Sequence, residues 1–178
     1  MKDRRHQLQK AMALDPFARP VMAAVAHTLF LARRYDDLIL MFEDRHDCRP
    51  NLEFDRYLGL AYIFSGARDK AESLADDILN TMSGASTCRT ISAELDAWLG
   101  RPVKAKCRLK DEQITSAERA LLYVAIGDYP MSLAALDSSR KRRDPIVLTL
   151  GSDARFDKLR GNERFKSIVS QTRVKRTV

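Results

Sequence analysis

Residues 58–71 of the chain read LGLAYIFSGARDKA. Apolar residues recur three and four positions apart on both sides of Gly66, which is the spacing of an amphipathic α-helix. Gly66 interrupts this pattern at a point where helices commonly end in the left-handed conformation, which glycine adopts without a Cβ penalty. The stretch therefore predicts two antiparallel helices joined by a tight turn, and the small residues Gly59 and Ala71 would allow their close approach.

Related segments recur along the chain. The positions equivalent to Gly66 are Arg33, Gly100 and Gly127, and successive turns lie 33, 34 and 27 residues apart. The first two separations match a repeat of two helices, for which a period of about 34 residues is typical. The third separation is shorter, so we expect a truncated second helix in the third repeat.

Two further signals support this division of the chain. Pro16 and Pro50 are 34 residues apart, and each would end the second helix of a repeat because proline cannot continue a helix. Thr115 and Glu118 form a capping-box pattern, which predicts that the fourth repeat begins at residue 115 or 116. Residues 110–112 would then lie in the preceding loop.

These residues resemble the tetratricopeptide repeat (TPR) family. Its strongest positions are matched by Leu58, Gly59, Tyr62, Gly66 and Ala71, and its closing proline by Pro16 and Pro50. The chain departs from the family pattern at Ala26, Leu38 and Ser132. The resemblance implies an all-α, right-handed superhelix of antiparallel helix pairs with a C-terminal capping helix. Residues 1–16 would form a half-repeat helix, 17–145 about four helical hairpins, and 146–178 the cap and a basic tail. A generic helical bundle is the alternative.

The terminal segment resembles the one that closes the repeats of many bacterial multidomain signalling and transcription regulators. There a paired Arg-Phe lies on either side of Leu-Arg, as Arg155-Phe156 and Arg164-Phe165 do here. The arginines are expected to face water and the chain to end naturally at Val178, while four apolar side chains cover the last repeat. These four are Phe156, Leu159, Phe165 and Ile168. At the other end, the half-repeat suggests either a longer parent protein or self-association as a homodimer.

The resemblance also implies a function. The first helix of each TPR repeat lines a concave groove that binds a peptide or helix, so the chain is expected to be a non-enzymatic protein-interaction scaffold. A secretion-type chaperone with the same fold is an alternative. The expected groove residues are His27, Phe30, Arg56, Leu60, Phe64, Glu94 and Trp98, with Leu121 and Val124 in the fourth repeat. The lining is largely apolar, and only Arg56 fits the carboxylate clamp of chaperone-binding relatives, so a hydrophobic segment suits this groove best. The rings could equally belong to the core between repeats.

Charge supports a second function of another class. The net charge is +7 and the isoelectric point about 9.5. A basic run, Arg140, Lys141, Arg142 and Arg143, and the tail residues Arg173, Lys175 and Arg176 supply much of the excess. Such clusters bind the phosphates of nucleic acids, but they also occur as solvated helix ends, where they complement the helix dipole.

Motifs for catalysis and cofactor binding are missing from the sequence. It contains no nucleophile elbow, phosphate-binding loop, HExxH or glycine-rich dinucleotide turn. Cys48, Cys88 and Cys107 form no CxxC pair and do not cluster with the histidines, so neither zinc nor a disulfide is expected. No secretory signal and no apolar run of about 18 residues occur. We therefore expect a cytoplasmic protein with no cofactor and no enzymatic activity.

Overall fold

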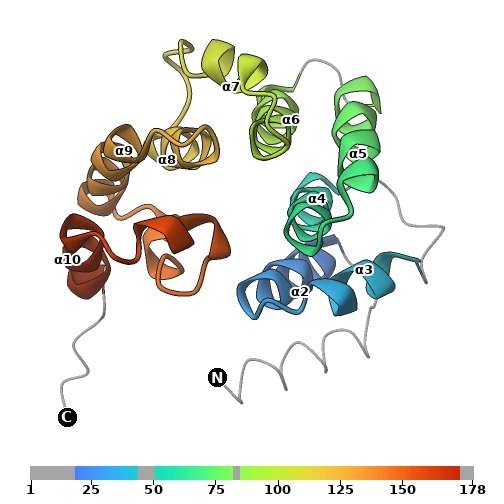
Figure 1. Cartoon of the computed structure of the whole chain (residues 1–178), viewed down its shortest axis with the longest axis horizontal. Coiled ribbons are helices and arrows are strands. Elements are labelled where there is room, and N and C mark those ends of the chain that lie inside the picture. Colours follow the sequence, from blue (N-terminus) through green and yellow to red (C-terminus); the bar gives the residue numbers. More distant parts are fainter. Residues whose placement is uncertain (1–18, 44–50, 82–84, 173–178) are drawn as a thin grey trace. The chain divides into compact units, whose positions relative to one another are not determined.

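The computed structural model describes residues 19–43, 51–81 and 85–172, and these ranges are all-helical, with no strand among them (Figure 1). The fold class predicted from the sequence, all-α, is confirmed for this part of the chain. The superhelical arrangement stays a prediction. The half-repeat helix over 1–16, the prolines Pro16 and Pro50 and the basic tail lie outside the described residues. No helix in the described ranges is both long and apolar enough to cross a membrane.

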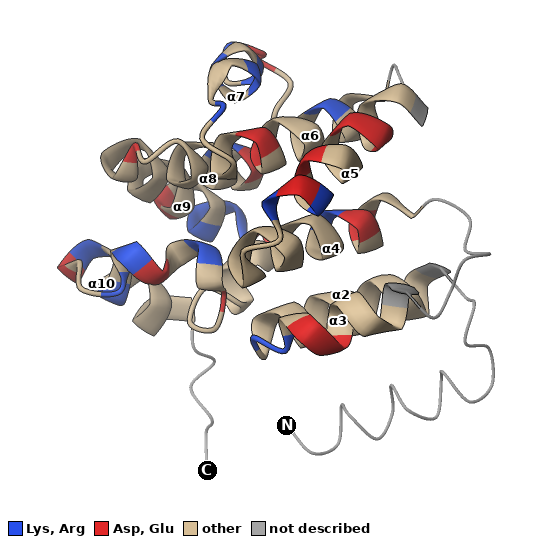
Figure 2. Ribbon diagram, turned by 45° about the vertical axis from the view of Figure 1, so that its right-hand side comes forward, with Lys and Arg blue, Asp and Glu red and all other residues tan. Residues whose placement is uncertain are grey.

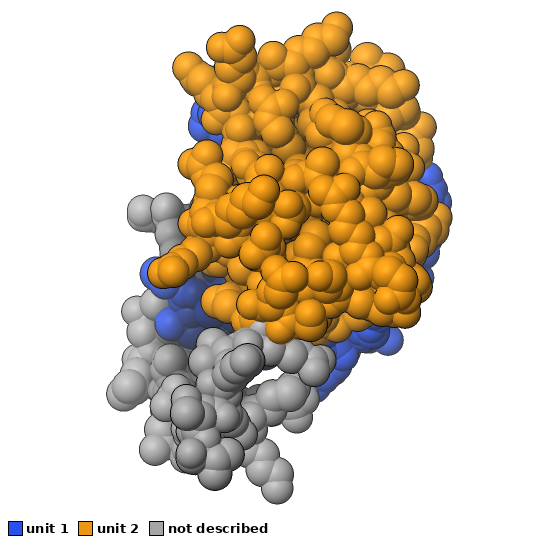
Figure 3. Space-filling model, turned by 90° about the vertical axis from the view of Figure 1, so that its left-hand side faces the viewer, with its two compact units in different colours: residues 1–91 blue, residues 92–178 orange. Residues whose placement is uncertain are grey.

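The chain divides into two compact units, residues 1–91 and 92–178 (Figure 3). Unit 1 contains α2 (Arg19–Leu31), α3 (Tyr35–Glu43), α4 (Leu52–Ser65) and α5 (Arg68–Thr81). Its last residues begin α6 (Ser86–Trp98), which continues into unit 2. α4 packs against α2, α3 and α5, and it is therefore the central helix of unit 1.

Helices α4 and α5 form the hairpin predicted from residues 58–71. On α4, the buried residues include Tyr57, Leu58, Ala61 and Tyr62, as the helical spacing predicts. On α5, the buried residues include Ala71, Ala75 and Ile78. Residue 71 has no exposed surface, so a side chain larger than its methyl group would push the two helices apart.

Unit 2 begins within α6 and holds the elements expected to form the rest of the third repeat, the fourth repeat and the cap. Its elements after α6 are α7 (Val103–Arg108), α8 (Ser116–Ala125), α9 (Tyr129–Arg142), the 3₁₀ helices η1 (Pro145–Leu148) and η2 (Ala154–Leu159), and α10 (Glu163–Thr172). The predicted truncation is confirmed, because α7 has only six residues. The predicted capping box is also confirmed: Thr115 Oγ1 accepts from the Glu118 N–H at 3.1 Å, and Glu118 Oε2 accepts from the Thr115 N–H at 2.7 Å.

The same turn closes five helices in the described ranges. In each, one residue adopts positive φ, and its N–H donates to the carbonyl of the residue three positions earlier. The N–H of the residue that follows it donates to the carbonyl five positions before that following residue. This is the Schellman motif, which satisfies carbonyls that would otherwise lack a partner at the helix end. The positive-φ residues are Arg33, Gly66, Gly100, Gly127 and Arg143. The first four are the turn positions that the repeat spacing predicts.

Ser132 of α9, one of the departures from the pattern expected from the sequence, has a hydrogen-bonding partner inside the structure. Ser132 is fully buried, and its hydroxyl donates a hydrogen bond to the Ala120 carbonyl at 2.9 Å. A buried hydroxyl is accommodated when it is bonded in this way. The bond links α8 to α9.

Candidate functional site

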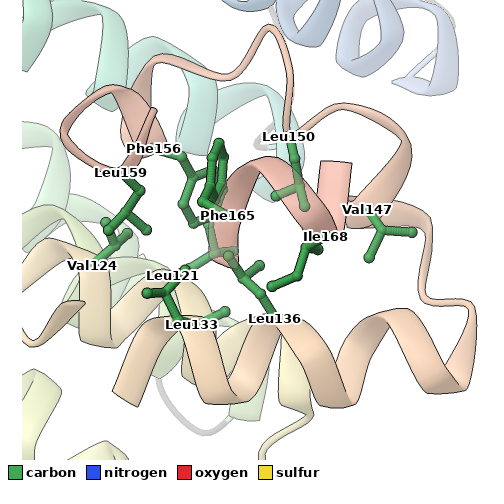
Figure 4. Close-up of a cluster of buried hydrophobic side chains, with 11 residues drawn as sticks. Leu121, Val124, Leu133, Leu136, Val147, Leu150, Phe156, Leu159, Phe165 and Ile168 are labelled. Carbon is green, nitrogen blue, oxygen red and sulfur yellow. The ribbon is translucent and has the colours of Figure 1, made fainter. Parts of the chain in front are cut away.

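In unit 2, the helix surface expected to line a groove is covered by the chain's own cap. Leu121 and Val124 of α8 belong to a buried cluster that also contains Phe156 and Leu159 of η2, and Trp98 of α6 packs against the same cluster (Figure 4). The prediction that Leu121 and Val124 line an open groove is therefore wrong. These side chains are core residues, because the cap places its rings over them.

The cap itself packs as the sequence predicts. Phe156 and Phe165 lie with their ring centroids 6.0 Å apart, and both are buried with Leu159 and Ile168 against α8 and α9. Figure 4 shows the two rings near the centre of the cluster, above the labelled side chains of α8 and α9 in this view. Burial of this many apolar groups is the main force that holds a cap to the last repeat.

The prediction for Glu94 is wrong as well. Its side chain has no exposed surface, and its Oε1 accepts from Arg155 Nη1 at 2.8 Å. Arg155 also donates through Nε and Nη2 to Asp153, the latter at 2.7 Å. Glu94 is therefore one member of a buried ion cluster and is not available to a ligand, because a carboxylate can be buried only when it is paired.

The same cluster corrects the expectation that both arginines of the repeated Arg-Phe pair face water. Arg164 is exposed, as predicted, but Arg155 is only 3% exposed. Sequence reasoning missed Arg155 as the partner of Glu94 and of Asp153, because nothing in the spacing of the pairs distinguishes the two arginines. The one local signal is Asp153 two positions before Arg155, where its carboxylate also caps η2.

In unit 1, aromatic side chains from α2, α3 and α4 form one connected cluster. The His27 ring stacks on Tyr57 at 4.7 Å between centroids, and Tyr57 contacts Phe30 at 5.6 Å. Phe30 contacts Phe64 at 5.8 Å, and Phe64 contacts Tyr35 at 5.9 Å. Such offset and edge-on pairs add about 0.5–1.5 kcal/mol each to the area they bury. The cluster therefore fixes the positions of its outermost rings.

The residues of unit 1 that were expected to line a groove differ in exposure, and only those with exposed surface could contact a ligand. Phe30 and Leu60 are fully buried, so their prediction as groove residues is wrong: they belong to the core of the chain. His27, Arg56 and Phe64 are half-buried. We call these three residues the α2–α4 face. Among the expected groove residues, they and the half-buried Trp98 are the ones that keep exposed surface.

The electrostatic setting of the α2–α4 face is uneven. After Arg19, its first residue, α2 carries no Lys, Arg, Asp or Glu, whereas α3 carries Asp36 and Asp37 in its first turn (Figure 2). On α4, Asp55 precedes Arg56, and burial raises the pKa of the Asp55 carboxyl to about 6, partly offset by a hydrogen bond from the backbone of Asn51. The charge beside the face therefore changes near neutral pH.

The basic run at the end of α9 is only partly free. Asp137 accepts from Arg140 at 3.0 Å and lies 3.4 Å from the Lys141 ammonium, and the Arg140 hydrogen bond holds the pKa of the Asp137 carboxyl below its ordinary value. Arg142 and Arg143 are exposed, and Arg143 also forms the left-handed cap of α9. The structure brings the four residues together at one helix end, with about half of their charge engaged locally.

Within the described ranges, no group of His, Cys, Asp and Glu side chains is arranged to hold a metal ion. Cys88 is buried and Cys107 exposed, each as a free thiol. No protein-family model, curated protein or solved structure matches the chain.

Proposed function

We propose that the chain is a non-enzymatic scaffold that binds an apolar segment of another protein on the α2–α4 face. The observation that carries this proposal is the half-buried Phe64 ring, held between the buried Phe30 and the half-buried Tyr35 at centroid distances of 5.8 and 5.9 Å. An aromatic side chain that keeps exposed surface while its neighbours fix its position loses little entropy on binding. Such residues commonly supply most of the energy of an interface.

The neighbouring residues define the kind of segment that would fit. His27 offers a flat ring with a polar edge, fixed by its stacking on Tyr57. Arg56 adds a cation on α4, two helical turns before Phe64. A segment with an apolar side chain for the rings and an acidic residue or a carbonyl for Arg56 would therefore match the face.

A double variant tests this assignment. Arg56→Glu with Phe64→Ala reverses the charge and removes the ring. A matched control is Arg68→Glu with Leu79→Ala, which makes the same charge change and removes a half-buried apolar side chain on α5. Immobilised wild type and both variants are incubated with lysate of the source cells, and bound proteins are compared by quantitative mass spectrometry.

The proposal expects proteins that are retained by wild type and by the control but lost by at least tenfold from the Arg56→Glu/Phe64→Ala variant, which corresponds to about 1.4 kcal/mol. Circular dichroism confirms that both variants stay helical. If all retained proteins bind the two variants equally well, the α2–α4 face is not the binding surface.

A further inference from the structure

A concave site lies in unit 2, on the side of α10 that faces the turn after η1. It has a volume of about 310 Å³, at the lower end of the range of about 300–1,000 Å³ for small-ligand pockets. Its lining comes from the 149–153 turn, the end of η2 and α10. The lining residues are Gly151, Arg160, Phe165, Lys166, Val169 and Ser170.

The floor of this pocket is apolar and fixed. Phe165 is buried in the cap cluster, and Val169 packs against that cluster from its edge. The opposite wall is fixed by Arg160, which donates to the Gly151 carbonyl at 2.6 Å, to the Asp153 carbonyl at 3.3 Å and to Asp157 at 2.7 Å. The hydrogen bonds of Arg160 and the packing of Phe165 and Val169 therefore hold both walls of the pocket in place.

Position 151 keeps the pocket open. A Cβ built on Gly151 would lie 3.7 Å from Val169 Cγ1, an ordinary van der Waals contact between two residues that line the pocket. The backbone there does not need the left-handed conformation, so a larger side chain fits without backbone strain. The volume of the side chain at position 151 therefore decides how much of the pocket is filled.

The rim of the pocket carries an exposed cation, Lys166. The Lys166 ammonium lies 2.6 Å from Glu163, but both side chains are strongly exposed, at 55% and 86%. An ion pair in this setting contributes little to stability, so Lys166 can exchange Glu163 for a ligand anion at little cost. Arg160 lies on the opposite wall, where its guanidinium is paired with Asp157 at 2.7 Å.

From these contacts we infer that the α10 pocket binds an aliphatic carboxylate, with its hydrocarbon on Phe165 and Val169 and its carboxylate at Lys166. Both a free branched-chain acid and the C-terminal residue of a peptide have this chemistry. The inference rests on residues of unit 2 alone and is independent of the function proposed for the α2–α4 face.

The test uses the full chain, labelled with ¹⁵N, and follows the backbone amides of Gly151, Lys166 and Val169. The probes are 4-methylpentanoate and the peptide acetyl-Gly-Gly-Leu with a free carboxylate, each up to about 20 mM because millimolar affinity is expected for so few contacts. The matched controls are 4-methylpentanamide and the C-terminally amidated peptide. Saturable shifts are expected for the two acids, with the neutral amides about two- to fivefold weaker. Tighter binding of the peptide acid identifies a peptide terminus as the source, and tighter binding of the free acid a small molecule.

Three variants complete the design. Gly151→Val is expected to weaken binding of the acid at least fivefold by filling the pocket, and Gly151→Ala to weaken it less. Lys166→Gln is expected to reduce it about two- to fivefold, whereas Lys158→Gln, an exposed lysine outside the pocket, leaves it unchanged. The inference is overturned if neither acid gives saturable shifts, if the amides bind as well as the acids, or if neither Gly151 variant weakens binding while its spectrum stays folded.

Discussion

Arg155 of η2 donates a hydrogen bond to Glu94 of α6 at 2.8 Å, across 61 positions in the sequence, and both side chains are buried. Asp153 accepts from the same guanidinium, so one cation holds two buried carboxylates. This contact ties the cap to the third repeat. It also explains why a surface expected to bind a ligand is filled by the chain's own residues.

The first prediction concerns this ion cluster. Arg155→Met would leave Glu94 and Asp153 buried without their shared cation, and removal of one partner from a buried pair costs about 3–5 kcal/mol. We expect the free energy of unfolding to fall by that amount, measured by urea denaturation followed by circular dichroism. Arg164→Met is the matched control, because that arginine is exposed in the second Arg-Phe pair. Its effect should stay within about 0.5 kcal/mol. Equal effects of the two variants would show that the cluster contributes no special stability.

The second prediction concerns the left-handed helix ends. Arg143 is exposed and caps α9 with φ of 58°, a conformation that costs a side-chain-bearing residue about 1 kcal/mol relative to glycine. Arg143→Gly should therefore raise the free energy of unfolding by about 0.5–1 kcal/mol. Gly127→Ala is the reverse experiment. No atom lies within 4 Å of the added Cβ, so any fall in the free energy of unfolding comes from the strain of a positive φ and not from a steric clash. A loss of about 1 kcal/mol is expected, and thermal unfolding measures both. A stabilising Gly127→Ala would contradict the assignment.

The third prediction concerns pH. Burial raises the pKa of Asp55 from 3.8 to about 6 in the folded chain. The folded state therefore holds this proton more tightly than the unfolded state, and its contribution to stability is full below pH 3.8 and is lost as the pH rises toward 6. The Asp55→Asn variant has no carboxyl to ionise at this position. Its free energy of unfolding should therefore rise relative to that of the wild type over this pH interval. The gain at pH 7 is expected to be on the order of 1 kcal/mol, allowing for solvent screening of a partly exposed group. Denaturation of both proteins at pH 4 and pH 7 measures it, and a constant difference would argue against the raised pKa.

The fourth prediction concerns the basic run and the nucleic-acid alternative. Asp137 engages Arg140 and Lys141, so Asp137→Asn would free two cations for phosphate contacts. If the run binds single-stranded RNA, the variant should steepen the dependence of log K on log salt concentration by up to about 1.4, from about 0.7 per phosphate. Fluorescence anisotropy with a labelled oligonucleotide measures this slope. Absence of binding by either protein at low salt removes nucleic acid as a ligand.

The local elements of this fold follow from the sequence. Four turn positions, from Arg33 to Gly127, were predicted from spacing, and each adopts positive φ at a helix end. The short α7 and the capping box at Thr115 were also predicted correctly. These features depend on residues within a few positions of one another, so a pattern along the chain is enough to reveal them. Arg143 adopts the same cap without such a signal, because arginine does not mark a left-handed residue.

The tertiary structure alone decided which side chains remain exposed. Helical spacing places Glu94, Leu121 and Phe64 on comparable faces of their helices. In unit 2 the cap covers Glu94 and Leu121, whereas Phe64, in unit 1, is half-buried. The burial of Glu94 depends on Arg155, which lies 61 residues away, and helical spacing carries no information about contacts at that distance. The sequence by itself therefore determined the helices, their turns and the cap. The location of a usable surface was set by long-range packing, in which a buried guanidinium and two aromatic rings occupy the face that would otherwise be open.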